Sequence, residues 1–319
     1  MQPQAVAPVL HIEGRSLRIE KMNRELGPII RGLLPDRTVV EILVNSDRKI
    51  WVERLGQPMQ CVGEMPASQA EALIGTLAAY HETVVTAEKA ILECILPING
   101  ARVEAIFPPV VASPVLSIRL RASSVFTLSQ YVEAGIMSQA QKEVLEKAIG
   151  NRKNILIVGS TGSGKTTLAN AAIAKIVEIN PEHRLVIIED TPEIQCKAEN
   201  AVILNTTDHE SMLSLLRATM RLRPDRILVG EVRGPEALAL MKSWNTGHPG
   251  GIATIHANSA RAGLIRLEQL IAEASVTPMQ ALIAEAVDII VFIEKTSMGR
   301  KIQEIVQVKG AENGHYVLE

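Results

Sequence analysis

The first third of the chain carries short apolar runs separated by polar breaks. Apolar residues recur at helical spacing over about 16–34, and Gly27-Pro28 is expected to interrupt this helix. A second helix is expected over about 68–81, among alternating runs typical of strands: 39–44, 49–53, 90–96, 102–107 and 115–120. We therefore predict a small α+β domain with an antiparallel sheet over residues 1–121, of which 1–15 are expected to be flexible.

Beyond a linker expected at 122–137, helices and strands alternate regularly. Helices are expected over 138–149, 165–179, 209–222, 235–244 and 260–274, and strands over 154–158, 185–189, 227–229 and 252–255. Continuous apolar strands such as ILIV and LVII, separated by helices, indicate a parallel sheet that is covered on both faces. Runs at 288–293 and 301–308 are expected to form a hairpin at the sheet edge. The pattern thus predicts an α/β domain with a mostly parallel sheet over residues 138–319.

Composition narrows the class of protein. The 319 residues are 47% hydrophobic and 21% charged, which disfavours disorder, and a formal net charge of −2 gives no overall attraction to nucleic acid or anionic lipid. Cys61, Cys94 and Cys196 form no CxxC pair and are expected to be reduced thiols of a cytoplasmic protein. No signal peptide is expected, because the first residues have no basic start followed by an apolar core. The apolar stretch 281–293 contains two carboxylates and is too short to span a bilayer.

The strongest chemical signal is GSTGSGKTT at 159–167, which fits the pattern G-x-x-x-x-G-K-[ST]. It follows an apolar strand and opens a helix, the setting in which backbone amides and a helix N-terminus bind phosphate. Lys165 can reach the β- and γ-phosphates, and the Thr166 hydroxyl can ligate Mg²⁺. A chance match is expected in about one such chain in a hundred, so we predict a nucleotide site. Its binding residues in this loop are predicted to be Ser160, Thr161, Gly162, Ser163, Gly164, Lys165, Thr166 and Thr167.

Three more candidate residues come at the ends of expected strands: Glu189, Glu231 and His256. Because ligands bind at the carboxyl edge of an open α/β sheet, these side chains are expected near the phosphates. Glu231 fits an acid that holds Mg²⁺ through water, although a glycine stands where the commonest form of the motif has aspartate. The alternative is that strand-end carboxylates are merely solvated or cap the next segment.

The chain resembles the traffic ATPases of type II and type IV secretion, type IV pili and plasmid transfer through four stretches in the same order: GSTGSGKTT, IIEDTPEI, ILVGEVRGPEA and GHPGGIATIHANS. GARVEAIFPPV and LSIRLRASS extend the resemblance into the first domain. The compact size and the linker resemble most the TrbB-type conjugal-transfer ATPases. The resemblance implies a RecA-like P-loop NTPase domain that binds ATP and Mg²⁺. No zinc is expected, because the chain lacks the CxxC pairs of family branches with a tetracysteine module.

The resemblance also implies roles for individual residues. It makes Glu189 the general base or water-positioner, Glu231 the Walker B glutamate and His256 a contact near the γ-phosphate. Arginines of the first domain are implied to close on the nucleotide: Arg102, Arg119 and Arg121. A solvated strand face is the alternative for these arginines, and it is open which of Arg119 and Arg121 reaches the nucleotide.

Two features of the second domain have no assigned role. His248 precedes the strand that His256 follows, and it is expected to shape its loop or to face a neighbouring subunit. The two histidines are not expected to bind zinc, because no cluster of cysteines or carboxylates completes such a site. The second feature is an arginine run, which forms either a solvated face or a subunit-interface or nucleotide-sensing group: Arg217, Arg221, Arg223 and Arg226.

The expected function is that of a homohexameric ATPase that energises a conjugative or type IV secretion system, for pilus biogenesis or for transfer of DNA and protein. It is expected in the cytoplasm, peripheral at the inner membrane, with inner-membrane components as partners and no stable binding of nucleic acid. A retraction-type pilus motor is the nearest alternative. A RecA-like nucleic-acid translocase, which would need a basic channel and stacking aromatics, is more distant.

Overall fold

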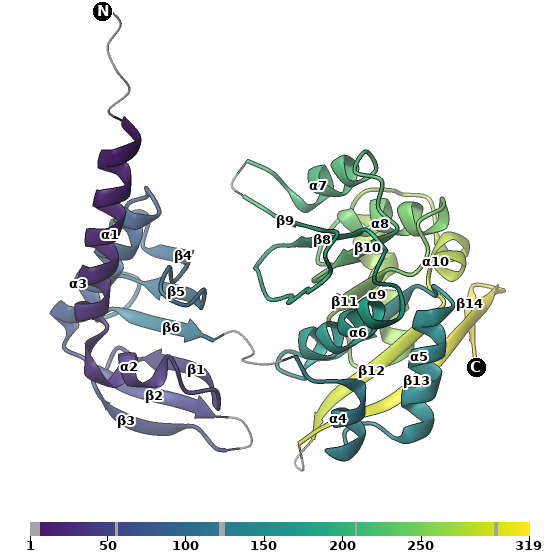
Figure 1. Cartoon of the computed structure of the whole chain (residues 1–319), viewed down its shortest axis with the longest axis horizontal. Coiled ribbons are helices and arrows are strands. Elements are labelled where there is room, and N and C mark those ends of the chain that lie inside the picture. The colour runs from purple at the N-terminus through teal and green to yellow at the C-terminus, as the bar shows by residue number, and fades with distance from the viewer. Residues whose placement is uncertain (1–6, 55–56, 121–124, 208, 297–298) are drawn as a thin grey trace, which may run out of the picture. The chain divides into compact units, whose positions relative to one another are not determined.

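The computed structural model describes residues 7–54, 57–120, 125–207, 209–296 and 299–319. The chain divides into two compact units, with the boundary after Ser123. Each unit has its own sheet and its own hydrophobic core, and Figure 1 labels their elements in chain order.

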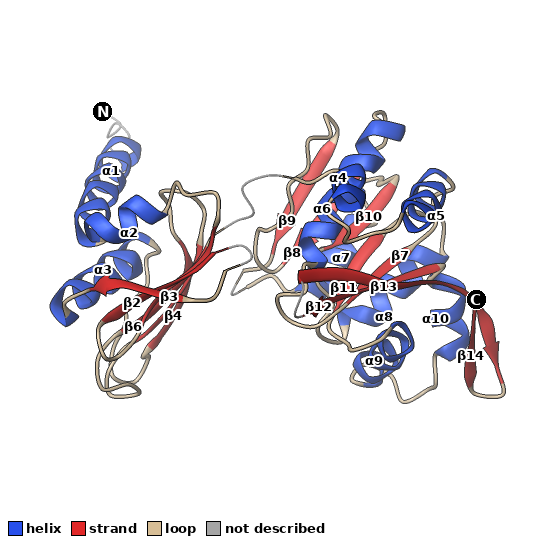
Figure 2. Ribbon diagram, turned by 90° about the horizontal axis from the view of Figure 1, so that it is seen from below, coloured by secondary structure: helices blue, strands red, loops and turns tan. Residues whose placement is uncertain are grey.

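The first unit is a six-stranded antiparallel sheet with helices on one face (Figure 2). Its strand order is β3-β2-β1-β6-β5-β4, and every neighbouring pair is antiparallel. The strands are β1 (Val39–Val44), β2 (Lys49–Arg54), β3 (Gln60–Glu64), β4 (Ile91–Ile95), β5 (Arg102–Ile106) and β6 (Val115–Arg119). The helices are α1 (Ala7–Glu25), α2 (Gly27–Leu33) and α3 (Ala67–Tyr80). This is the α+β arrangement that the pattern predicts.

Alternation along the strands decides which face of this sheet the helices cover. Ile42 of β1 and Ile118 of β6 are buried in one core with Met22 of α1. Glu41 and Arg119, each one position away, are half-buried on the opposite face, because successive side chains of a strand point to opposite sides.

The N-terminal helix begins earlier than expected. Residues 7–15 are helical, whereas the sequence pattern suggests a flexible segment. Pro8 stands in the first turn of α1, where the missing N–H of proline costs no hydrogen bond. The predicted interruption is confirmed: Gly27 has a left-handed φ of 70°, and Pro28 lies at the start of α2.

The boundary between the units, after Ser123, falls inside the expected linker 122–137, but most of that segment belongs to the second unit. Helix α4 (Leu128–Glu133) lies inside the expected linker, yet Leu128 and Tyr131 are buried in the core of the second unit. A capping box starts this helix, because Thr127 Oγ1 accepts from Gln130 N at 3.2 Å and Gln130 Oε1 accepts from Thr127 N at 2.9 Å. A polar cap signal therefore marks the entry to the second unit within a segment whose composition resembles a loop.

The second unit is a mixed eight-stranded sheet with the order β14-β13-β12-β7-β11-β10-β8-β9. Neighbours from β12 to β9 are parallel, and β13 and β14 join them as antiparallel strands. The strands are β7 (Ile155–Val158), β8 (Leu185–Glu189), β9 (Ala201–Asn205), β10 (Arg226–Val229), β11 (Ile252–Ile255), β12 (Ile289–Thr296), β13 (Gly299–Glu312) and β14 (His315–Leu318). The further helices are α5 (Gln139–Gly150), α6 (Lys165–Ile179), α7 (Met212–Thr219), α8 (Glu236–Asn245), α9 (Ala260–Ala272) and α10 (Gln280–Ala286).

Helices cover both faces of this second sheet (Figure 2). Ile155 and Ile157 of β7 pack in a core with α4, α5 and α6. Leu156 and Val158 of the same strand pack in a second core with α7, α8, α9 and α10. A strand that is buried on both sides accounts for the uninterrupted apolar run ILIV.

Five elements have no counterpart in the predicted pattern: β3, α4, β9, α10 and β14. Strand β9 contains the apolar run AVIL, but it is an edge strand whose residues are only half-buried or exposed. Helix α10 takes up the start of the apolar stretch 281–293, and β12 takes up the rest. No helix in the described part of the chain is both long enough and apolar enough to cross a membrane.

Candidate functional site

The sheet order gathers the predicted site residues of the second unit at one edge. Strands β7, β11, β10 and β8 are consecutive and parallel, so their carboxyl ends meet there. The phosphate loop leaves β7, His256 follows β11, Glu231 lies just beyond β10 and Glu189 ends β8.

The phosphate loop has a left-handed backbone at two of its glycines. Gly162 and Gly164 have φ values of 72° and 99°, in the left-handed region that favours glycine. At Gly159 a Cβ would collide with the carbonyl oxygen of Ile293 and with Ser163 Oγ, so β12 confines the loop from one side. The loop then enters α6 at Lys165, and left-handed glycines that lead into a helix N-terminus fit a cradle for phosphate.

Lys165 ties the loop to the next strand. Its side chain is buried, with the residue 7% exposed, and Nζ donates to the Ser160 carbonyl at 3.0 Å. Nζ also lies 3.2 Å from His256 Nδ1. Because an ammonium only donates, Nδ1 accepts, which places the ring proton of neutral His256 on Nε2.

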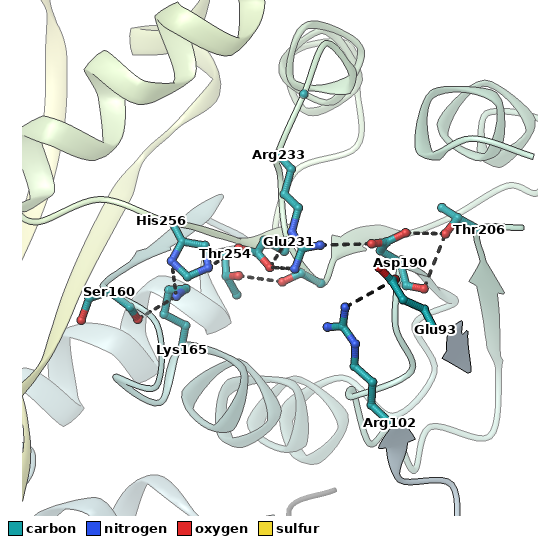
Figure 3. A network of polar contacts seen from close by, with 12 residues as sticks. Glu93, Arg102, Ser160, Lys165, Asp190, Thr206, Glu231, Arg233, Thr254 and His256 are labelled. Atoms are coloured by element: carbon teal, nitrogen blue, oxygen red, sulfur yellow. Dashed lines mark hydrogen bonds and ion pairs between the residues drawn. The ribbon is translucent and has the colours of Figure 1, made fainter. Parts of the chain in front are cut away.

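Glu231 is the centre of the remaining contacts. Its Oε1 lies 2.6 Å from His256 Nε2, and its Oε2 lies 2.6 Å from Arg233 Nη2. Arg233 Nη1 reaches Asp190 Oδ2 at 3.1 Å, and Asp190 Oδ1 accepts from Thr206 Oγ1 at 2.6 Å. Figure 3 shows this chain of contacts running from Ser160 and Lys165 through Glu231 to Thr206.

Glu189 is held differently from Glu231. It is 2% exposed, and its Oε1 accepts hydrogen bonds from the backbone amides of Glu193 at 2.8 Å and Ile194 at 2.7 Å. These bonds fix the carboxylate and the acidic stretch that follows β8. By contrast, the Glu231 side chain is 17% exposed and the His256 side chain 43%, so these two are accessible from solvent.

The glycine in place of the common aspartate has a structural reason. A Cβ on Gly230 would lie 3.2 Å from Glu189 Cγ and 3.5 Å from its Oε1. The Gly230 carbonyl, just after β10, also accepts a hydrogen bond from Thr254 Oγ1 of β11 at 2.7 Å. The position is therefore packed directly against the buried glutamate, with little room for a side chain.

The arginines predicted in the first unit lie on its open sheet face. Arg102 of β5 and Arg119 of β6 are directly opposite each other, and Glu41 of β1 is opposite Arg119. Arg102 Nη2 lies 3.9 Å from Glu93 Oε2, and both side chains are partly exposed. Arg121 lies outside the described residues. The two described arginines thus share one face, next to acidic neighbours.

The two histidines of the stretch GHPGGIATIHANS lie at opposite ends of β11, since His248 precedes the strand and His256 follows it. They do not form a metal pair. Within the described residues, no group of three or more histidine, cysteine or acidic side chains is arranged to hold a metal ion.

The four arginines of the run fall into two groups, one buried residue and three exposed ones. Arg226 is 0% exposed and donates to the carbonyls of Ile149 at 3.0 Å and Gly250 at 3.1 Å, to Asn180 Oδ1 and to His183 Nδ1. It is therefore a structural group at the amino edge of the sheet. The other members are exposed on α7 and the turn after it: Arg217, Arg221 and Arg223.

Sequence reasoning missed three polar residues of the site: Asp190, Thr206 and Arg233. Asp190 and Arg233 stand inside the quoted motifs IIEDTPEI and ILVGEVRGPEA, next to residues that were selected. Thr206 follows β9, which is not among the expected strands; the apolar run AVIL at 201–204 is the signal that could have indicated this strand.

Comparison with known proteins gives a consistent assignment. The sequence matches the family described as "Type II/IV secretion system protein" over residues 22–315. It is 52% identical to the probable conjugal transfer protein TrbB of Sinorhizobium fredii, over 94% of this chain and 93% of that one. It is 32% identical to the type IV secretion system protein PtlH homolog of Bordetella bronchiseptica, over 82% of this chain and 87% of that one. The resemblance to the secretion ATPase family, drawn from the motifs, and the narrower resemblance to TrbB-type proteins, drawn from the compact size and the linker, are confirmed.

A solved structure shows the same fold. The ATPase DotB of Legionella pneumophila superposes with a TM-score of 0.63 at 17% identity, over 96% of this chain and 83% of that one. At this identity the similarity concerns the fold alone.

Proposed function

The chain belongs to the type II/IV secretion system protein family, and on this basis we propose that it is an ATP-hydrolysing motor that energises a conjugative type IV secretion system. The observation that carries the proposal is the contact chain Lys165–His256–Glu231–Arg233–Asp190 beside a glycine-rich loop. It joins a cation for phosphate, a titratable ring and two carboxylates at one sheet edge, the groups that phosphoryl transfer to water needs.

The phosphate loop fits a nucleoside triphosphate with Mg²⁺. Gly159 leaves no room for a side chain against β12, and Lys165 is held beside the loop by contacts that phosphate oxygens can replace. Thr166, the next residue of α6, would supply a hydroxyl to Mg²⁺, and Glu231 would hold the ion through water. When bound, Mg²⁺ neutralises charge on the phosphate oxygens.

In the proposed reaction, a water oxygen forms a bond to the γ-phosphorus while the bond from that phosphorus to the β–γ bridging oxygen breaks. Glu189 positions this water and takes its proton, and the two amide bonds on its Oε1 keep the carboxylate in place. His256, with its proton on Nε2, links Glu231 to Lys165, so that changes at the phosphate reach Arg233 and Asp190. The site residues thereby form one connected group rather than separate contacts.

The finer features of the proposal come from the family. We infer a RecA-like P-loop domain, assembly as a homohexamer, and a peripheral location at the cytoplasmic face of the inner membrane with components of a secretion complex as partners. That Arg102 and Arg119 contact the nucleotide stays a prediction. Mass measurement in solution, with and without nucleotide, tests the assembly: a strictly monomeric chain with full activity contradicts it.

Lys165→Ala tests the reaction. We expect ATP hydrolysis to fall by about a hundredfold or more, because a charge on the developing γ-phosphate is lost, while the unfolding temperature stays close to that of the wild type. Lys147→Ala, on the exposed side of α5, is the matched control and should hydrolyse ATP at the wild-type rate. Unchanged hydrolysis in Lys165→Ala would refute the assignment of the loop.

A further inference from the structure

The C-terminal strands form one wall of the phosphate loop. Strand β12 pairs with β7 in parallel, which brings Ile293 against Gly159, and its side chain against Gly164. Strand β13 returns antiparallel to β12 and places Arg300 opposite Lys295, near the beginning of the strand. A segment more than 130 residues away in sequence therefore borders the loop.

Arg300 lies directly across the loop. Its Nε donates to the Gly162 carbonyl at 3.3 Å. Its Cδ would lie 3.0 Å, and its Nε 3.3 Å, from a Cβ placed on Gly164. The guanidinium thus covers the two left-handed glycines that flank Ser163, the part of the loop whose amides are to face phosphate.

No carboxylate among the described residues forms an ion pair with Arg300. Its Nε is used on Gly162, and within the described residues the two Nη nitrogens make no hydrogen bond or ion pair. The side chain is half-buried, so the charge is only partly solvated. An arginine that is anchored by Nε and has a planar pair of donors left over is suited to bind phosphate oxygens.

We propose that Arg300 is a second cation of the nucleotide site: its Nε holds the loop at Gly162, and its Nη groups bind the phosphates of the nucleotide. The inference rests on the proposed function, since it needs a nucleotide in the loop. Its consequence is that the β12–β13 hairpin belongs to the site, on the side of the loop opposite to β11 and His256.

The test compares Arg300→Met with Lys301→Met. Methionine keeps an unbranched side chain against Gly164 but has neither charge nor N–H. Lys301 is the exposed neighbour on the other side of the strand, so its variant removes one charge from the same hairpin. Binding of ADP, of inorganic pyrophosphate and of adenosine is measured by calorimetry or competition, together with the unfolding temperature of each ligand-free protein.

For Arg300→Met we expect ADP and pyrophosphate to bind about tenfold more weakly or worse, the factor for losing one charge-assisted hydrogen bond, and adenosine to bind as in the wild type. Lys301→Met should bind all three as the wild type does. Arg300→Lys, which keeps the charge, should recover part of the pyrophosphate binding and serves as the second variant if Arg300→Met does not fold.

Three results overturn the inference. Binding of ADP and pyrophosphate within twofold of the wild type in Arg300→Met shows that the guanidinium does not contact phosphate. An equal loss for adenosine, with a lowered ligand-free unfolding temperature, shows a purely structural role. Equal losses in Arg300→Lys and Arg300→Met exclude a role for the charge. If the wild-type chain itself binds no ADP, the proposed function fails and the inference fails with it. If the wild type binds ADP and Arg300→Met binds it equally well, the inference alone fails.

Discussion

Gly230 offers a direct test of how the two glutamates are arranged. The commonest form of this strand-end motif has an aspartate here, so Gly230→Asp looks like a change toward the consensus of the motif. The structure predicts the opposite outcome. A Cβ at this position would lie 3.2 Å from Glu189 Cγ, tighter than ordinary van der Waals contact, and a carboxylate would stand beside a glutamate that is 2% exposed.

The magnitude has a steric part and an electrostatic part. Placing a side chain against Glu189 should cost about 1–3 kcal/mol of unfolding free energy, the usual range for overpacking. Two carboxylates about 4 Å apart repel by roughly 4 kcal/mol at an effective dielectric constant of about 20. Gly230→Asn carries only the steric part, so Gly230→Asp should be less stable than Gly230→Asn by roughly 2–4 kcal/mol at neutral pH.

The assay is urea unfolding followed by tryptophan fluorescence. The chain has two tryptophans, and Trp244 is buried in the second unit. A Trp51→Phe background therefore reports the second unit alone. As the pH falls toward 4, one carboxyl of the pair takes up a proton, and the gap between the Asp and Asn variants should close. If Gly230→Asp is as stable as Gly230→Asn at neutral pH, Glu189 does not lie against this position as we describe.

Two further predictions concern Glu231 and His183. Glu231→Gln removes the charge that faces His256 and Arg233. The rate of ATP hydrolysis, measured by phosphate release, should fall about a hundredfold, while the affinity for ADP, measured by titration, should stay within a few-fold of the wild type. Parallel losses of hydrolysis and ADP binding would argue for a structural role. His183 accepts from Arg226 through Nδ1, and burial, followed by the charges of Arg226 and Arg152, lowers the pKa of the imidazole. The unfolded chain therefore takes up this proton first as the pH falls below about 6.5, so the unfolding free energy should decrease from there until the folded pKa is reached. His183→Asn should flatten that dependence, and an unchanged pH profile would contradict the contact.

The sequence predicts the architecture of the second unit well, because its central strands are buried on both faces and read as unbroken apolar runs. It also predicts which strand ends meet, since parallel strands bring their carboxyl ends to one edge. Edge strand β9 is missing from the predicted strands although it contains the apolar run AVIL, and its residues are only half-buried or exposed in the sheet. Helix α4 escapes because its cap, Thr127, resembles the turn residues of a linker.

What the sequence cannot predict is which neighbours complete the site. Arg300 and Ile293 reach the phosphate loop only because β12 pairs with β7, and no motif links residues so far apart in the chain. Likewise, the partner of Asp190 is fixed by the pairing of β8 with β9, which places Thr206 beside it. Local patterns specify the strands, whereas contacts across the sheet depend on strand order.

Strand order also explains why similar residue types serve different purposes at the two ends of the sheet. At the amino edge, Asn154 Oδ1 accepts from the amides of Gly250 and Gly251, and Arg226 donates to the Gly250 carbonyl and to His183. These buried polar groups therefore have their hydrogen-bond partners within the protein. At the carboxyl edge, Glu231 and His256 keep solvent access, and Lys165 is held by contacts that a phosphate can replace. In the proposed site, an arginine or a histidine of this fold acquires a ligand-binding role from the edge of the sheet at which it lies. Arg226, at the start of β10, lies at the amino edge, whereas Arg300, at the start of the antiparallel strand β13, lies at the carboxyl edge. His248 and His256 are separated in the same way, since one precedes β11 and the other follows it.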